Sequence, residues 1–385
     1  MNALPADAAT AREPLRVLHL RDSPWLDGPG RTVLETGSHI DGTRVEFHIG
    51  AFVNDPAAAH PLVDNARARG IRVHAIADRG KVNEVVEQIV KLIDDERIDV
   101  LHSSEFRSNV LALLCRRHRK RIALVTTAHG WIANDFRGRI YRVLDKVLLR
   151  LFDRVIFVSE AMRRRVPGFW LKAKRCRVLL NALVFESYGR DMLDRPRSTP
   201  DPARDVVLVN VGRLSAEKAQ DLLLRAVAAL LPEFPGIRLK FAGIGPLEAD
   251  LRSLTDSLGI AGRVEFLGYV ANMPALYIEA DLVVQSSLTE GLPNVILEAA
   301  YLRVPIVATA VGGTDEVVTH GKSAWLLPPG SLAALTAGIR EYLRRPGEFV
   351  AMGDAAHRHV REHFSFTART MRLMDVYDEL RNVLR

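Results

Sequence analysis

The stretch from Val206 to Lys218 reads VVLVNVGRLSAEK and shows the architecture of the second half of the chain. Residues 206–211 form a short apolar run rich in valine, which is typical of a strand buried on both faces. Gly212 then permits a tight exit from the strand, and a helical stretch follows. A strand that leads through a short turn into a helix is the repeating unit of a parallel α/β sheet.

The same alternation of strands and helices extends over most of the chain. In the first half, strands are predicted at residues 15–20, 45–49, 71–76, 99–102, 122–126, 154–158 and 177–180, with helices that include 81–95 and 105–118. In the second half, strands are predicted at 206–211, 238–242, 263–267, 282–285 and 306–308, and helices at 218–231, 247–258 and 293–302. Each half has the pattern of a parallel sheet covered by helices.

Residues 191–205 interrupt this pattern, because they are polar, rich in proline and without periodicity. Such a composition is typical of an interdomain linker. We therefore predict one domain over 15–190 and a second over 206–364. Residues 1–14 are expected to be a flexible tail, and residues 365–385 contain a final helix.

The composition is that of a globular protein, with 48% hydrophobic and 26% charged residues among 385. The two cysteines, Cys115 and Cys176, are too few for a disulfide framework. We expect both to be buried free thiols in a reducing, cytoplasmic setting. The chain starts without a signal-peptide pattern, and no stretch reaches the ~18 apolar residues of a membrane-spanning helix.

Positive charge is concentrated in the first half of the chain. The formal net charge is +7, and residues 1–200 carry 34 Lys and Arg against 24 Asp and Glu. Most of the excess lies in residues 107–177, which could contact an anionic membrane, an anionic acceptor or nucleic acid. Because aromatic residues are not interleaved with these charges as in a base-stacking platform, nucleic acid is not expected as a partner.

Residues 137–150 form the most amphipathic part of this basic stretch. Their apolar residues fall on one helical face, and they are Ile140, Val143, Leu144, Val147 and Leu148. Two interpretations stay open: an interfacial helix at the inner membrane face, or a helix that packs on the sheet.

Residues suited to binding a diphosphate follow two predicted strands. Arg213 and Lys218 are cations between a strand exit and a helix start, where helix N–H groups also favour anions. Gly243 and Gly245 precede Pro246 after the next strand, where backbone can approach a phosphate closely. Alone, each of these patterns is also compatible with an ordinary loop.

The segment 286–299, SSLTEGLPNVILEA, is the most informative part of the sequence. Pro293 is placed to start a helix, so that Glu290 lies in the loop before it and Glu298 in its second turn. The two carboxylates are then about 10 Å apart, which suits the two ends of a long ligand better than one acid–base pair. The apolar neighbours of Glu298 indicate that its carboxylate needs a partner.

Three further segments follow predicted strands and expose backbone to a ligand. Gly312 and Gly313 precede a probable helix, and Gly28 and Gly30 occur in the segment DGPGR that ends at Arg31. A strand exit also carries His129 just before a glycine, which makes ligand contact and a structural role equally good interpretations of this histidine.

In their order and spacing, these segments resemble family 4 glycosyltransferases. The likeness covers residues 206–330 well, and residues 153–165 (DRVIFVSEAMRRR) resemble the N-terminal domain of the same family. The resemblance implies the GT-B fold: two facing Rossmann-like, doubly wound α/β domains, with a C-terminal helix that crosses back to the N-terminal domain. It places the acceptor on the N-terminal domain and the nucleotide-sugar on the C-terminal domain.

The resemblance also implies an activity. A retaining enzyme of this kind moves a hexose-type sugar from a nucleoside-diphosphate sugar to a lipid-linked or polysaccharide acceptor in cell-envelope glycan synthesis. UDP is the expected nucleoside diphosphate of the donor. The nucleotide-sugar is a substrate, so no cofactor and no obligatory metal are expected.

Residue roles carry over by motif. Arg213 and Lys218 would bind the donor diphosphate, Glu290 would hold hydroxyls of the donor sugar, and Glu298 would hold the ribose. His129 completes the predicted catalytic set. The remaining donor-binding candidates are Gly212, Gly243, Gly245, Gly268, Tyr269, Val270, Gly291, Leu292, Pro293, Gly312 and Gly313. On the acceptor side the candidates are Gly28, Gly30 and Arg31.

The chain departs from the family pattern at three places. It has Gly28-Pro29-Gly30 where a Gly-Gly pair is expected, Ala219 where a glycine often follows the basic residue, and Leu180-Asn181-Ala182 in place of Pro-Asn-Gly. None of these changes removes a charged group. A nucleotide-sugar epimerase of the same architecture and a non-catalytic two-domain binding protein remain as alternatives.

Overall fold

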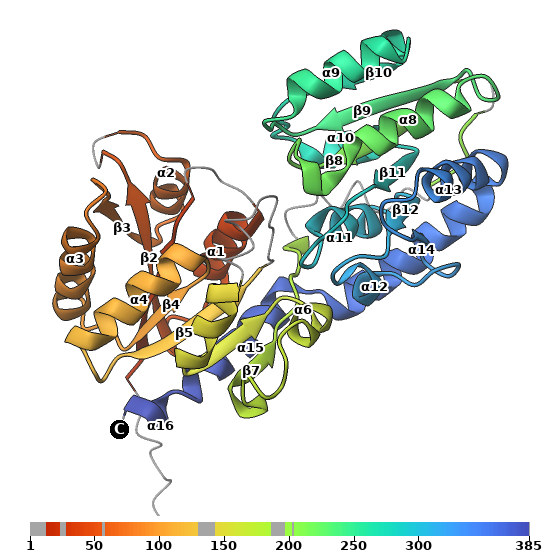
Figure 1. Ribbon diagram of the computed structural model, residues 1–385. Coiled ribbons are helices and arrows are strands. Elements are labelled where there is room, and N and C mark those ends of the chain that lie inside the picture. The colour runs from red at the N-terminus through yellow and green to blue at the C-terminus, as the bar shows by residue number, and fades with distance from the viewer. Residues whose placement is uncertain are drawn as a thin grey trace, which may run out of the picture. The chain divides into compact units, whose positions relative to one another are not determined.

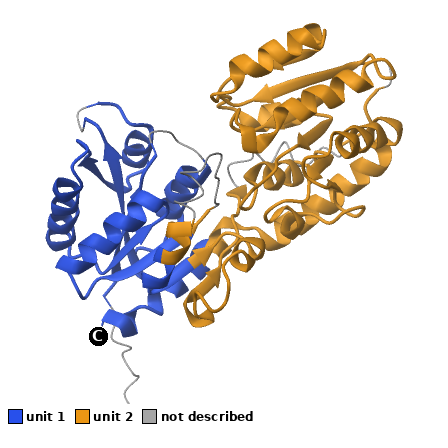
Figure 2. Cartoon of the chain, in the orientation of Figure 1, with its two compact units in different colours: residues 1–127, 148–155, 370–385 blue, residues 128–147, 156–369 orange. Residues whose placement is uncertain are grey.

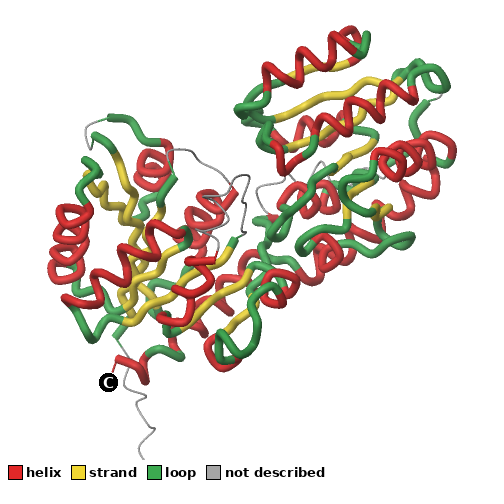
Figure 3. The backbone as a smooth tube through the Cα atoms, in the orientation of Figure 1, coloured by secondary structure: helices red, strands yellow, loops and turns green. Residues whose placement is uncertain are grey.

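The computed structural model describes residues 13–23, 28–55, 58–129, 143–185, 197–201 and 204–384. Strands and helices alternate through these ranges (Figures 1 and 3). Most of the predicted tail, most of the predicted linker and the first part of the amphipathic segment 137–150 lie outside the described residues.

The first half of the chain builds a seven-stranded sheet with the order β3-β2-β1-β4-β5-β6-β7. Its strands are β1 (Leu15–Arg21), β2 (Val45–Val53), β3 (Arg72–Ala77), β4 (Val100–Ser103), β5 (Ala123–Ala128), β6 (Arg154–Phe157) and β7 (Cys176–Val178). The pairings that join β3 to β2, β2 to β1, β1 to β4 and β4 to β5 are all parallel. The strand order reverses between β1 and β4, which is where open α/β sheets bind ligands.

Helices follow the strands of this sheet in turn. They are α1 (Gly28–His39), α2 (Pro61–Ala68), α3 (Val82–Asp95), α4 (Phe106–His118) and α6 (Glu160–Arg164), with the 3₁₀ helices η1 (Leu149–Leu151) and η2 (Ala173–Arg175). Helix α1 contacts α2, and α3 contacts α4, as two separate pairs (Figure 1). This pairing is the one expected when right-handed crossovers cover both faces of a doubly wound sheet.

The second half repeats this topology in a six-stranded sheet of order β10-β9-β8-β11-β12-β13. Its strands are β8 (Val206–Val211), β9 (Ile237–Ala242), β10 (Val264–Phe266), β11 (Leu282–Gln285), β12 (Ile306–Thr309) and β13 (Trp325–Leu327). All five pairings are parallel. Strands β8 and β11 flank the point of reversal, as β1 and β4 do in the first sheet.

The helices of the second half complete a Rossmann-like domain. They are α8 (Gln220–Leu230), α9 (Glu248–Ser257), α10 (Met273–Glu279), α11 (Asn294–Tyr301), α12 (Thr314–Val317), α13 (Leu332–Arg344) and α14 (Pro346–His363), with the 3₁₀ helices η4 (Ala216–Lys218) and η5 (Ala261–Arg263). Leu223 of α8 and Phe241 of β9 are fully buried in the same core. Truncating such a core side chain to Ala costs about 2–5 kcal/mol.

The chain divides into two compact units (Figure 2). One unit contains residues 1–127, 148–155 and 370–385, and the other contains 128–147 and 156–369. The second unit thus includes residues that precede the predicted linker. The domain boundaries at 190 and 206 stay a prediction from the sequence.

The C-terminal helices return to the N-terminal strands, as the fold class requires. Helix α15 (Phe366–Asp378) ends in the first unit, followed by α16 (Arg381–Leu384). The fully buried hydroxyl of Tyr377 is hydrogen-bonded to Nδ1 of His102 in β4 at 2.8 Å. Arg44 Nη2 donates to Asp375 Oδ1 at 2.9 Å.

The predicted α/β class with two Rossmann-like sheets is confirmed. Three element predictions need correction. Strand β2 is longer than expected and ends at Val53, and the single C-terminal helix is two helices. The helix expected at 218–231 begins only at Gln220, because Ala219 adopts a left-handed conformation.

Candidate active site

Lys218 and Glu290 form an ion pair with 2.6 Å between Nζ and Oε1. Lys218 ends η4 after strand β8, and Glu290 lies in the loop after β11. Only 23% of the Lys218 side chain and 12% of the Glu290 side chain are exposed. The structure thus brings two predicted catalytic residues together at the carboxyl ends of neighbouring strands.

The carboxylate of Glu290 is held by more than this ion pair. Its Oε1 also accepts hydrogen bonds from Gln285 Nε2 at 3.1 Å and from Ser287 Oγ at 2.7 Å. Ser286 Oγ donates to the carbonyl of Lys218 at 2.8 Å, which joins the two loops directly. A half-buried carboxylate with three donors is compensated for its loss of water and fixed in orientation.

Arg213 differs from Lys218, because its side chain is exposed. Its carbonyl accepts a hydrogen bond from Gln220 Nε2 at 2.9 Å, which fixes the backbone of the loop. In the described part of the chain, no acidic side chain lies within ion-pair distance of its guanidinium. The strand exit therefore presents one paired cation and one open cation, a combination suited to an anion.

Ala219 has φ +49° and ψ +45°, a left-handed conformation that glycine adopts far more easily. This is the position at which the family often carries glycine. The backbone conformation is therefore kept here without the glycine. The side chain is 4% exposed, so the strain is located inside the packed turn that carries Lys218.

The loops after β8, β9 and β10 meet at Gly243. With φ +142°, this residue passes so close to Gly212 that a Cβ would lie 2.0 Å from the Gly212 carbonyl oxygen. The amide of Gly243 also donates to the carbonyl of Gly268 at 2.8 Å. Gly245 lies in the same turn. Beyond Gly268, the side chain of Tyr269 is 61% exposed and Val270 is half-buried.

Gly291 brings His129 beside the loops of the C-terminal half. A Cβ on Gly291 would lie 1.9 Å from the carbonyl oxygen of His129, which directly follows β5. The amide of Gly313 donates to the carbonyl of Gly291 at 2.7 Å, and Gly312 precedes it with φ +59°. The predicted residues His129, Gly291, Gly312 and Gly313 are thus adjacent within one unit.

Leu292 and Pro293 complete this loop and are both buried. The carbonyl of Leu292 accepts a hydrogen bond from Asn181 Nδ2 at 3.1 Å. Pro293 is the residue before α11 rather than its first residue. Asn181, the one residue of the expected Pro-Asn-Gly that this chain keeps, therefore binds the loop that carries Glu290.

Glu298 lies in the second turn of α11. Its carboxylate has a hydrogen-bond partner, as predicted from its apolar neighbours. The hydroxyl of Tyr277, fully buried on α10, donates to Glu298 Oε2 at 2.7 Å. The guanidinium of Arg197 in turn donates to the carbonyls of Tyr277 and Ala280. Burial lowers the pKa of Arg197. Sequence reasoning missed both Tyr277 and Arg197, because no motif or spacing marks them.

The predicted acceptor-side residues lie in the first unit. Gly28, Gly30 and Arg31 form the first turn of α1, and Thr32 Oγ1 donates to the carbonyl of Gly28 at 3.1 Å. The segment therefore opens α1, and both glycines lie inside this helix.

Sequence reasoning also missed a charged cluster where the strands of the first sheet end. Arg107 Nη1 lies 3.3 Å from Oδ1 of Asp22, which follows β1. Its Nη2 lies 2.7 Å from Oδ2 of Asp78, which follows β3. Arg21, 3% exposed, is paired with Glu105 after β4. Arg21 and Arg107 are therefore neutralised by carboxylates.

The two cysteines differ in burial. Burial raises the pKa of Cys115 to about 12, so this thiol is inert at neutral pH. Cys176 is only half-buried, which corrects the expectation that both thiols are buried.

Among the described residues, no group of three His, Cys, Asp or Glu side chains could hold a metal ion. Within the same ranges, no helix has the length and apolar character needed to cross a bilayer.

Two family models match this chain. "Glycosyltransferase Family 4" matches residues 26–184, and "Glycosyl transferases group 1" matches residues 193–359. The "Putative glycosyltransferase EpsD" of Bacillus subtilis is 28% identical over 304 residues, which cover 76% of this chain and 80% of that protein. The "D-inositol 3-phosphate glycosyltransferase" of Thermobispora bispora is 30% identical over 309 residues, 74% of this chain and 71% of that protein.

Solved structures show the same fold. HepE of Anabaena in complex with UDP-glucose has a TM-score of 0.82 at 20% sequence identity, over 95% of this chain and 100% of that chain. Because the identity is low, this likeness concerns the fold alone. Taken with the family models and the relatives, it leads to one conclusion: the chain belongs to glycosyltransferase family 4 and is a GT-B glycosyltransferase.

Proposed function

We propose that this chain transfers a hexose from a UDP-sugar, with retention of anomeric configuration, to a lipid-linked or polysaccharide acceptor in cell-envelope glycan synthesis. The observation that carries the proposal is the Lys218–Glu290 ion pair beside the exposed Arg213, at the ends of β8 and β11. The UDP and UDP-glucose complexes of HepE, a protein of the same fold, support the choice of base.

The cations act on the leaving group. As the bond between the sugar C1 and the β-phosphate oxygen breaks, its electron pair stays on the nucleoside diphosphate and the sugar becomes oxocarbenium-like. Arg213 and Lys218 stabilise this growing negative charge more than they stabilise the ground state. Their two positive charges make the proposed step independent of a metal ion.

The carboxylates position the donor. Oε1 of Glu290 already accepts three hydrogen bonds, so we assign the hydroxyls of the donor sugar to Oε2. Glu298, oriented by Tyr277, is assigned to the ribose. His129 lies next to Gly291 and is assigned to the reaction centre, where the acceptor hydroxyl attacks C1 and its proton passes to the departing diphosphate oxygen.

The remaining donor contacts are backbone contacts. Gly212, Gly243 and Gly245 lie in the turns at the strand exits. We assign the Gly312 amide to the phosphates, and Gly313, whose amide donates to the Gly291 carbonyl, holds this turn in place. The segment from Gly268 to Val270 is assigned to the base. The proposed setting is the cytoplasm, with peripheral contact at the inner membrane face through the basic stretch 107–177.

The test is a thermal-shift panel of UDP, GDP, ADP and CMP with the wild type and Glu298→Ala. A nucleotide at 100-fold excess over its Kd stabilises the folded state by about 2.7 kcal/mol. We expect UDP to raise Tm most among the four nucleotides, and Glu298→Ala to reduce this shift. The control is Glu279→Ala, which removes a carboxylate paired with Lys240 in the same half. No shift in a folded wild type, or an equal loss in the control, would contradict the proposal.

An epimerase would use the same nucleotide site but release its sugar without an acceptor. The relatives named above are glycosyltransferases and give this alternative no support. A non-catalytic binding protein would bind the nucleotide in the same panel, yet it would not turn over the donor.

A further inference from the structure

Residues 163–177, RRRVPGFWLKAKRCR, place two aromatic residues between two basic runs. Phe169 is 82% exposed, the highest value among the large hydrophobic side chains of the described residues. The ring of Trp170 is half-buried and packs edge-on against Phe169, with 6.1 Å between ring centroids. The tip of this loop thus presents apolar surface to solvent, at a cost in hydration free energy that a binding partner would remove.

The loop is firmly anchored at both ends. Val166 and Leu171 are 8% and 4% exposed, and the amide of Trp170 donates to the carbonyl of Pro167 at 2.9 Å to close a turn. The exposure of Phe169 is therefore built into an ordered turn. A single exposed apolar residue is common, but an aromatic pair held out by a fixed turn indicates a contact surface.

Basic side chains surround this turn. Arg164 is 76% exposed, and Lys172 and Lys174 are exposed on the other side of the aromatic pair. Neither lysine has an acidic partner within ion-pair distance among the described residues. The combination of aromatic residues with unpaired lysines is complementary to an anionic lipid interface.

The segment before the loop extends the same surface. Lys146 Nζ donates to the carbonyl of Arg165 at 2.9 Å, which holds this segment beside the loop. Val143, Leu144 and Val147 are 51%, 45% and 39% exposed. For these residues, exposure favours the interfacial interpretation of the amphipathic helix over packing on the sheet.

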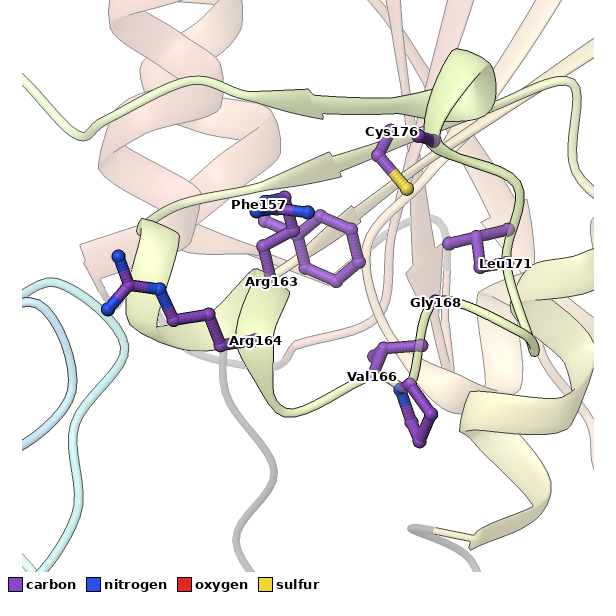
Figure 4. Close-up of a pocket in the computed structure, with 9 residues that line it drawn as sticks. Phe157, Arg163, Arg164, Val166, Gly168, Leu171 and Cys176 are labelled. Carbon is purple, nitrogen blue, oxygen red and sulfur yellow. The ribbon is translucent and has the colours of Figure 1, made fainter.

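A cavity of about 270 Å³ lies behind the loop (Figure 4). It is lined by Phe157, Arg163, Arg164, Val166, Pro167, Gly168, Leu171, Ala173 and Cys176. Arg163 is bound by Glu160 through both carboxylate oxygens, at 2.9 and 2.8 Å, and Arg164 extends away from the cavity in Figure 4. The cavity behind the aromatic tip is thus lined by both apolar and basic side chains.

We propose that residues 163–177 dock the protein on an anionic lipid surface. Phe169 and Trp170 enter the headgroup region, while Arg164, Lys172 and Lys174 lie among the lipid phosphates. This inference rests on the proposed function, because a lipid-linked acceptor would be reached at a membrane surface. It adds to the contact of the predicted amphipathic segment a loop that follows this segment in the chain.

The test is binding of the full chain to vesicles of phosphatidylcholine with about 30% phosphatidylglycerol, compared with phosphatidylcholine alone. We expect binding to the anionic vesicles that weakens with salt, with a blue shift of Trp fluorescence that Trp170→Phe removes. Phe169→Ala should lower the affinity about tenfold. Lys172→Ala and Lys174→Ala should each lower it about fivefold on anionic vesicles only.

Matched controls separate this loop from general surface effects. Ile278→Ala removes an apolar side chain that is 48% exposed on α10, and Lys91→Ala removes a lysine that is 80% exposed on α3. Both should bind vesicles as the wild type does. Equal losses in the controls, no wild-type binding at low salt, or tighter binding to a single-stranded oligonucleotide than to vesicles would overturn the inference. The nucleotide-induced Tm shift, measured on the same samples, tells a failure of docking from a failure of the proposed function.

Discussion

The two sheets share their strand order but differ in charge where their first strands end. After β8, Arg213 is exposed and has no acidic partner among the described residues, while Lys218 is paired with Glu290. After β1, the corresponding edge contains Arg107, which lies between Asp22 and Asp78. The second edge keeps an arginine without an acidic partner among the described residues, whereas Arg107 at the first edge is neutralised by two carboxylates.

This difference fits the general rule that a fold offers the place for a ligand, while its loops select the ligand. A doubly wound sheet offers its carboxyl edge in both halves. An open guanidinium beside a buried ion pair suits a diphosphate, whereas carboxylates that clamp an arginine suit the hydroxyls of an acceptor.

The largest effect is expected from removing the cations of the second edge. Lys218→Ala and Arg213→Ala should each lower kcat by about 10²–10³-fold, because each removes a charge aimed at the leaving diphosphate. The measurement is the rate of nucleoside diphosphate release from the donor in the presence of an acceptor.

A matched variant shows whether position matters or charge alone. Lys240→Ala also removes a lysine paired with a carboxylate, 2.8 Å from Glu279. It should change kcat by less than about twofold, as expected for a surface ion pair. Near-wild-type turnover in both Lys218→Ala and Arg213→Ala would refute the assignment of these residues.

The fold was largely predictable from the sequence, because buried parallel strands read as apolar runs and glycines mark their exits. The sequence motif identified Lys218 and Glu290 as site residues, but it did not predict their ion pair. That contact depends on how the loops after β8 and β11 meet. Tyr277 was not predictable, because it is distant from Glu298 in sequence and carries no motif.

The aromatic turn shows a different limit. Phe169 and Trp170 stand between two basic runs, but neither residue belongs to a motif that would mark it as exposed. Apolar residues in an α/β sequence are usually core, and only the structure separates the exposed Phe169 from the buried Leu171.

A smaller effect is expected from the strained turn of the second edge. Ala219→Gly should raise the unfolding free energy by about 1 kcal/mol, because glycine accepts positive φ without a steric penalty. The comparison is Ala216→Gly in η4, a residue without positive φ, which should lower it by about 0.5–1 kcal/mol. Denaturant unfolding measures both, and a stability loss in Ala219→Gly would show that the turn is not strained.

The least marked effect belongs to the first sheet and depends on pH. His48 Nδ1 and His74 Nε2 are 3.0 Å apart on β2 and β3, and burial lowers the pKa of both. Below a pH of about 6.5, the unfolded state therefore binds more protons than the folded state. The free energy of unfolding therefore decreases as the pH is lowered. His74→Gln should flatten the decline of Tm between about pH 7 and 5. The exposed His118→Gln should leave the slope unchanged, and an equal change in both would contradict this account.

The most direct test of the central claim is calorimetric titration of the nucleoside diphosphate that the thermal-shift panel identifies. The comparison is between Arg213→Ala, at the second edge, and Arg107→Ala, at the first. We predict that Arg213→Ala raises Kd by about tenfold or more, while Arg107→Ala stays within about twofold of the wild type. If Arg107→Ala weakened binding as much as Arg213→Ala, the donor would not be assigned to the second sheet and the account would be wrong.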